Sequence, residues 1–246
     1  MSLMKTIQGA SHFSNWRGRA TLVLAGAWLA LTSGITVSAP SDLKPERELY
    51  TSHLRHGRDA DALALIGTAI GVNEPANCGI TPLHQAIIAQ RRAVVVDLVR
   101  RGANVNAVRC KGWTPLMDAS AGINSSAAIV AVLTANGAQV NARRYDGKTA
   151  LHLATESWNR TVVLMLLDAK ADPNPRDAEG RTPLFYAPDG SVARMLVEAG
   201  ADIGVRDKQG NLPYDVVKRT ERERMGDGPL RDSSSDYIKS ASPPAP

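Results

Sequence analysis

Cysteine and aromatic residues are scarce in this chain of 246 residues. It has two cysteines, and Phe, Trp and Tyr together make up 4% of its residues. Two cysteines cannot build a disulfide-dense scaffold, nor can they supply all the ligands of a zinc finger on their own. A β-sandwich usually holds more aromatic and β-branched residues, so this composition favours helix. With 43% hydrophobic and 22% charged residues, the chain is long enough for one globular core.

A strong excess of one charge is also missing. The formal net charge is +5, but three of the 29 basic residues (Lys5, Arg17 and Arg19) lie in residues 1–39, where no residue is acidic. The rest of the chain holds 26 basic and 24 acidic residues. This near-neutral balance, together with the lack of a groove-entering motif, gives no support to a nucleic-acid partner, and we expect none.

Residues 21–41 contain no charged residue and directly follow a basic flank. A basic flank, an apolar run and then small residues are the typical order of a secretory signal peptide. The most apolar part, residues 22–31, is too short to span a bilayer, whereas the whole run of about 20 residues would just span it. We therefore predict a signal peptide or an N-terminal membrane anchor at residues 1–39, with the rest of the chain exported, periplasmic or secreted. A buried core helix is the remaining alternative.

An internal repeat governs the chain from about residue 49 to residue 220. The segments GITPLHQA, GWTPLMDA, GKTALHLA and GRTPLFYA align through their threonines, which are Thr81, Thr114, Thr149 and Thr182. The spacings are 33, 35 and 33 residues. A second signature, an asparagine, lies eight residues before each threonine: Asn73, Asn106, Asn141 and Asn174. Apolar residues at helical spacing lie between these signatures, so each unit alone leaves apolar faces that only stacking on its neighbours can bury.

This pattern resembles the ankyrin-repeat family, whose period is about 33 residues and whose signature is T-P-L-H-x-A. The resemblance covers about 170 of the 246 residues. It implies an all-α solenoid of about four full repeats with terminal caps. Each repeat would be a helix, a tight turn, a second helix and a β-hairpin-like loop. The departures are two extra residues near 122–124, a shortening of about three residues around 188–190, and Lys170 where a helix-ending glycine is usual.

The repeat also sets the expected domain boundaries. We predict a linker at 40–47, one ankyrin-repeat domain at 48–224 and a disordered tail at 225–246, which is rich in Ser, Pro and Gly. Within the domain we expect an N-terminal cap at 48–75, repeats at 76–108, 109–143, 144–176 and 177–206, and a C-terminal cap at 207–224.

His84 and His152 are the histidines of two TPLH-like boxes. In the resembled family this histidine is structural, and Met117 and Phe185 occupy its place in the other two boxes. A metal-binding or catalytic set would not tolerate those replacements. The sequence also lacks the motifs of serine hydrolases, zinc proteases and phosphate-binding loops. We therefore expect no enzyme, no catalytic residue, no metal and no cofactor.

Cys78 and Cys110 lie three and four residues before the threonines of two adjacent boxes. In an ankyrin array both positions fall at the tips of neighbouring hairpins. A disulfide needs Cα atoms within about 7 Å, and export would permit oxidation. Such a bond would stabilise the chain by up to roughly 3 kcal/mol. Two free thiols are the alternative.

The hairpin tips and the exposed side of the first helices form the concave face of an ankyrin array, which is the usual binding face. Trp and Tyr flanked by Arg are common hot-spot residues, and such a basic patch would suit an acidic partner. The candidate protein-binding residues on this face are Arg109, Lys111, Trp113, Arg144, Tyr145, Asp146, Lys148, Trp158, Glu179 and Arg181.

The sequence thus predicts a monomeric, non-catalytic module that binds a protein partner of unknown identity outside the cytoplasmic membrane. Two alternatives share the fold. One is a stabilising accessory subunit of an exported enzyme. The other is a cytoplasmic adaptor, if the apolar segment at the N-terminus is not an export signal.

Overall fold

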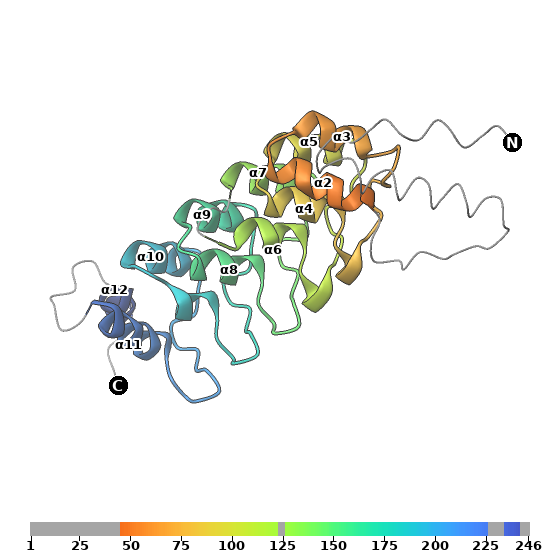
Figure 1. Ribbon diagram of the computed structural model, residues 1–246. Helices are drawn as coiled ribbons and strands as arrows, with labels where there is room; N and C mark the ends of the chain where they lie inside the picture. Colours follow the sequence, from red (N-terminus) through yellow and green to blue (C-terminus); the bar gives the residue numbers. More distant parts are fainter. Residues whose placement is uncertain (1–44, 123–125, 226–233, 242–246) are drawn as a thin grey trace, which may run out of the picture. The chain divides into compact units, whose positions relative to one another are not determined.

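The computed structural model describes residues 45–122, 126–225 and 234–241 (Figure 1). The predicted signal peptide or anchor at 1–39 lies outside these residues. Among the helices that are described, none has the length and apolarity needed to cross a membrane. The chain forms helix after helix, and within the described ranges the only β-type pairings are two isolated bridges.

The helices form two rows (Figure 1). The row that we call inner consists of α2 (Pro45–Arg55), α4 (Pro82–Ile88), α6 (Pro115–Ser120), α8 (Ala150–Glu156), η3 (Pro183–Tyr186) and α11 (Pro213–Met225). The outer row consists of α3 (Asp59–Leu65), α5 (Arg92–Arg100), α7 (Ala127–Ala135), α9 (Arg160–Asp168), α10 (Gly190–Glu198) and α12 (Ser234–Ala241). Each helix packs on its neighbour in the same row and on its partner in the other row. This arrangement is the all-α solenoid that the repeat predicts.

The threonine boxes start the inner helices as expected. The hydroxyls of Thr81 and Thr114 each accept a backbone N–H from the third helical residue, and a proline follows each threonine. In the fourth box Thr182 makes no such cap, and the inner helix is reduced to the 3-10 turn η3. This is where the repeat is about three residues short. The outer helix of the same unit, α10, is capped by Asp189, whose side chain accepts backbone N–H bonds from the first turn of the helix.

The leucine of each box points into the stack. Leu83, Leu116, Leu151 and Leu184 are at most 1% exposed. The outer helices contribute the facing side of the core, and in α5 this side is Val94, Val95 and Leu98. The apolar faces of consecutive repeats therefore build one continuous core.

The repeated asparagines tie neighbouring repeats together. Asn106, for example, donates a hydrogen bond to the carbonyl of Gly137 and accepts one from the backbone N–H of Gln139. The same pair of hydrogen bonds is made by the other three asparagines: Asn73, Asn141 and Asn174. Each amide thus satisfies backbone groups at the end of the next outer helix, where intrahelical partners run out.

Both ends of the array differ from the sequence-based boundaries. Helix α2 begins at Pro45, so residues 45–47 of the predicted linker are helical. At the other end α11 continues to Met225, and α12 forms inside the segment predicted to be disordered. The side chain of Ile238 is 1% exposed because α12 packs on both α10 and α11. Composition missed this helix because one apolar anchor in a Ser-rich segment gives little signal.

Candidate protein-binding surface

The hairpins between repeats are closed by one recurring pattern. In the second hairpin the backbone N–H of Arg109 bonds the carbonyl of Trp113, and that of Gly112 bonds the carbonyl of Arg109. Gly112 has a φ of +80°, and a Cβ on it would lie 2.9 Å from the Cα of Arg144 in the next hairpin. Glycine is needed there both for the turn and for the close approach of the neighbouring hairpin.

Successive hairpins are joined tip to tip by backbone hydrogen bonds. The N–H of Tyr145 donates to the carbonyl of Lys111, at 3.1 Å. Equivalent bonds join the next two pairs of hairpins, Ala178 to Asp146 and Lys208 to Glu179. The loops therefore form one connected strip along the inner helices. We call the strip and the exposed side of the inner helices the hairpin face.

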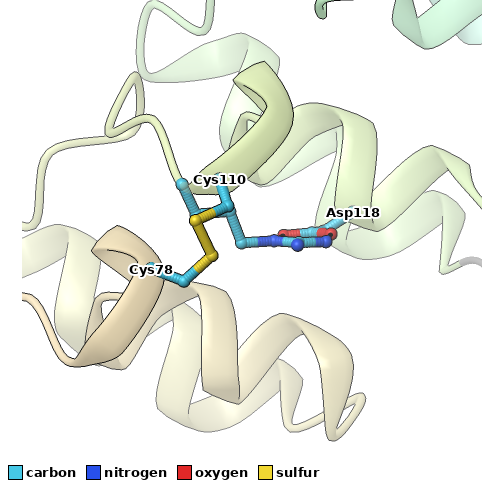
Figure 2. Close-up of a disulfide and its surroundings, with 4 residues drawn as sticks. Cys78, Cys110 and Asp118 are labelled. Atoms are coloured by element: carbon cyan, nitrogen blue, oxygen red, sulfur yellow. Dashed lines mark hydrogen bonds and ion pairs between the residues drawn. A yellow bond between two sulfur atoms is a disulfide. The ribbon is translucent and has the colours of Figure 1, made fainter.

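The first junction is made by a disulfide. Cys78 and Cys110 occupy the two positions that the backbone hydrogen bond joins in the later pairs, and the structure links their Sγ atoms (Figure 2). Their Cα atoms are 4.9 Å apart, within the normal range for a disulfide. Both residues are exposed. The bond thus holds two hairpin tips together at the surface.

Trp113 lies between two arginines. The guanidinium carbon of Arg109 is 4.7 Å from the centroid of the indole ring, and that of Arg144 is 4.6 Å from it. Because Arg144 belongs to the next hairpin, the indole fills the space between two repeats and is half-buried. Its stacked position makes Trp113 a part of the scaffold as well as of the surface.

The basic residues around Trp113 are paired within the molecule. Arg109 holds Asp118 of α6, with 3.0 Å between Nε and Oδ2, and Asp118 is 8% exposed (Figure 2). Arg144 pairs with Asp146, and this hydrogen bond keeps the pKa of the Asp146 carboxyl below its usual value. The basic patch suggested by the sequence is therefore largely neutralised by neighbouring acids.

A second polar cluster follows in the next two repeats. Lys148 lies 2.9 Å from a carboxylate oxygen of Glu156 and stacks on the ring of Tyr186. The hydroxyl of Tyr186 donates a hydrogen bond to Asp177, and burial together with this bond raises the pKa of the phenol. Arg181 pairs with a buried carboxylate in the last hairpin, that of Asp207.

Tyr145 is the most accessible aromatic side chain of the hairpin face, with 87% of its surface exposed. Lys111 and Glu179 are also exposed at their hairpin tips. Trp158 lies elsewhere, in the turn between α8 and α9, and lines a shallow hollow with Arg160 and Asp189. The structure thus gathers nine of the ten candidate residues on the hairpin strip and places Trp158 apart from it.

Both box histidines are buried and bonded to the backbone. Nδ1 of His84 accepts the N–H of Thr81, and Nδ1 of His152 accepts the N–H of Thr149. The other ring nitrogen of His152 lies 3.1 Å from the carbonyl of Arg181 in the next repeat. Burial lowers the pKa of both imidazoles. Within the described residues no group of three or more His, Cys, Asp or Glu side chains could hold a metal ion.

The repeat places Asp118, Asp177 and Asp207 on this surface, but it does not predict what these acids bind. Asp118 is the buried counterion of Arg109, while Asp177 and Asp207 accept backbone N–H groups that close their own hairpins. A signal for the last two was present: Asp177 lies five residues before Thr182, and Asp207 lies five residues before Leu212, which takes the place of the box threonine in the last unit. The repeat also predicts that Asp118 lies on the surface side of an inner helix, but its pairing with a hairpin arginine shows only in the fold.

Comparison with known proteins agrees with this architecture. A family model described as ankyrin repeats (3 copies) matches residues 54–144, 95–177 and 121–207, which together span more than half of the chain. The search of curated proteins found no match to the chain. Ankyrin repeats are generally protein–protein interaction modules, and the family is typically non-catalytic. The chain therefore belongs to the ankyrin-repeat family.

Proposed function

We propose that the hairpin face, which corresponds to the concave face of an ankyrin array, binds a protein partner without catalysis. The observation that carries this proposal is Tyr145, 87% exposed at the tip of a hairpin whose backbone is bonded to the hairpin before it. Tyrosine offers a large amphipathic contact area with few torsions to immobilise. A side chain displayed in this way on a connected strip has a low ordering cost on binding.

The charges of the hairpin face favour specificity over raw affinity. Arg109, Arg144 and Lys148 are already paired with acids of the same chain. A partner gains little net attraction from such pairs, although it must match their pattern to avoid leaving a charge uncompensated. We therefore expect Tyr145 and the stacked Trp113 to supply most of the binding free energy.

The test is affinity capture from the producing cells with the full chain as bait, beside two single variants. Tyr145→Ala removes the exposed ring from the hairpin face. Leu164→Ala, the control, removes a side chain that is 47% exposed on the outer helix α9. We expect one protein that is retained by the original chain and by Leu164→Ala and is depleted about tenfold or more on Tyr145→Ala. Equal retention on all three baits would exclude Tyr145 from the binding site.

We also propose that the chain works outside the cytoplasmic membrane, in the periplasm or as a secreted protein. The supporting observations are the basic flank and uncharged run at residues 17–41 and the exposed cysteine pair at disulfide distance. Disulfides persist in oxidising compartments. Cell fractionation with thiol alkylation tests this location. We expect the chain outside the cytoplasm with both cysteines protected from alkylation, and free thiols in the cytoplasmic fraction would contradict it.

A further inference from the structure

Helix α7 carries apolar residues on the side that faces solvent as well as on the side that faces the core. Its sequence, AAIVAVLTA, contains no charged residue. Ile129, Val130 and Leu133 are buried in the core. The opposite side carries Ala131, which is exposed, and the flank carries Val132, which is half-buried and partly packed against the core. A helix that is apolar all round is normally covered on all sides, and this one is covered on one side by the described residues.

The exposed side of α7 forms one wall of a groove in the outer row. The other wall is α5, which contributes Val96 and Val99. Arg92 and Arg100, near the two ends of α5, also line the groove, and none of its lining residues is acidic. The groove thus has an apolar floor with a positive charge near each end.

These two arginines differ from their immediate neighbours in the chain. Arg91 is paired with Asp59, and Arg101 is paired with Asp97. Neither Arg92 nor Arg100 has an acidic partner in the part of the chain that the structure describes. They stand eight residues apart on one helix, which places their backbones about 12 Å apart along its axis.

We propose that the groove between α5 and α7 binds an acidic amphipathic helix of a protein partner. The apolar face of that helix would pack on Ala131 and Val132, where small side chains allow two helix axes to come close. Two carboxylates on its flank, about two helical turns apart, would pair with Arg92 and Arg100. The surface belongs to the outer row and is separate from the hairpin face, so the chain could hold two partners at once.

The chemistry of the groove argues against a lipid surface as its occupant. Peripheral helices insert Trp, Phe or Leu side chains into a bilayer. The residues that line this groove include none of these; its apolar members are alanine and valine. A concave apolar strip between two helices also suits a helix better than a flat membrane.

The experiment measures the fluorescence anisotropy of a labelled peptide as it is titrated with the full chain. The peptide has about 18 residues, with leucines along one helical face and two glutamates about eight residues apart on its flank. We expect saturable binding, and about tenfold weaker binding when the glutamates are replaced by lysines. No saturation up to about 1 mM chain would overturn the proposal.

Three variants locate the bound peptide. Ala131→Gln places a longer, neutral and helix-favouring side chain on the groove floor, and the double variant Arg92→Glu with Arg100→Glu reverses both charges. Each should weaken binding about tenfold or more. The control, Arg55→Glu with Arg219→Glu, makes the same change of net charge at exposed residues of α2 and α11 and should leave binding unchanged. Equal weakening by the control would mean non-specific charge attraction and would overturn the proposal.

Two further outcomes would assign the groove to another occupant. If sedimentation velocity of the full chain shows a dimer that Ala131→Gln dissociates, a second copy of the chain covers the groove. If the chain floats with anionic phosphatidylglycerol vesicles and the same variant abolishes this binding, the groove binds a membrane surface. Either result overturns the helix proposal. It leaves the function proposed for Tyr145 untouched, because that residue lies on the hairpin face.

Discussion

Removing the disulfide should destabilise the chain by about 3 kcal/mol. The bond between Cys78 and Cys110 has a sequence separation of 32 residues, close to one full repeat. In the chain-entropy model, closing a loop of this length stabilises the folded state by about 3–4 kcal/mol. In the double variant Cys78→Ser with Cys110→Ser, the backbone N–H of residue 110 can donate to the carbonyl of residue 78, as the equivalent residues do in the later hairpins. That bond offsets about 1 kcal/mol of the loss.

The assay is thermal and urea unfolding of the oxidised chain and of the double serine variant, each with and without dithiothreitol. For a domain of this size, 1 kcal/mol corresponds to about 2–4 °C, so the midpoint should fall by about 6–12 °C. Dithiothreitol should lower the midpoint of the original chain by a similar amount and leave the variant unchanged. Midpoints within about 2 °C of each other would refute the reasoning.

The loss should also be local. Because each repeat contacts only its neighbours, the first junction should open while the last one stays closed. Hydrogen exchange should speed up at the amide of Arg109 in the variant and stay slow at the amide of Asp207, which closes the last hairpin. Uniform acceleration along the whole array would contradict this.

Three further predictions concern stability. Gly112→Ala should lower the free energy of unfolding by more than about 2 kcal/mol, because the added Cβ would meet the backbone of the next hairpin. Gly210 has a φ of +83° and open space around it, so Gly210→Ala should lower the free energy of unfolding by about 1 kcal/mol. Equal urea midpoints for the two variants would refute the close approach of the hairpins. Lys170→Gly should stabilise the chain by about 1 kcal/mol, because Lys170 has a φ of +65° at a helix end, and an unchanged or lower midpoint would contradict this. Burial lowers the pKa of His84 and His152 in the folded chain. At a pH below the unfolded pKa of about 6.5, the unfolded chain therefore binds more protons than the folded chain. As the pH falls from there to the folded pKa, the free energy of unfolding should drop by about 1.4 kcal/mol per pH unit for each histidine. Urea midpoints that stay flat from pH 7 to pH 5 would show that these imidazoles are not buried in the neutral form.

The repeated residues made most of the fold predictable. Thr81 and its equivalents start the inner helices, the following leucines fill the core, and the asparagines bind the next repeat. These residues recur because they make the same local contacts in successive units, with the exception of Thr182, which caps no helix. What does not recur was harder to predict. Helix α12 depends on Ile238 finding a site between α10 and α11, and such a tertiary contact leaves no periodic trace in the sequence.

The candidate surface was predictable in its place but not in its electrostatics. Tyr145 and Lys111 fall at hairpin tips because the period puts them there. The period does not reveal that Arg144 stacks on Trp113 or that Arg109 neutralises a buried Asp118. Those partners lie on different elements, so only the three-dimensional arrangement shows which charges remain available to another protein.

Hydroxyl-radical footprinting of the chain with its captured partner tests the central claim most directly. The ring of Tyr145 is 87% exposed and should be oxidised readily in the free chain. In the complex we expect its oxidation to fall about fivefold or more, while Leu164, which is 47% exposed on the outer helix α9, keeps its rate. An unchanged rate at Tyr145 in a saturated complex would show that the partner binds elsewhere and would contradict the assignment of the hairpin face.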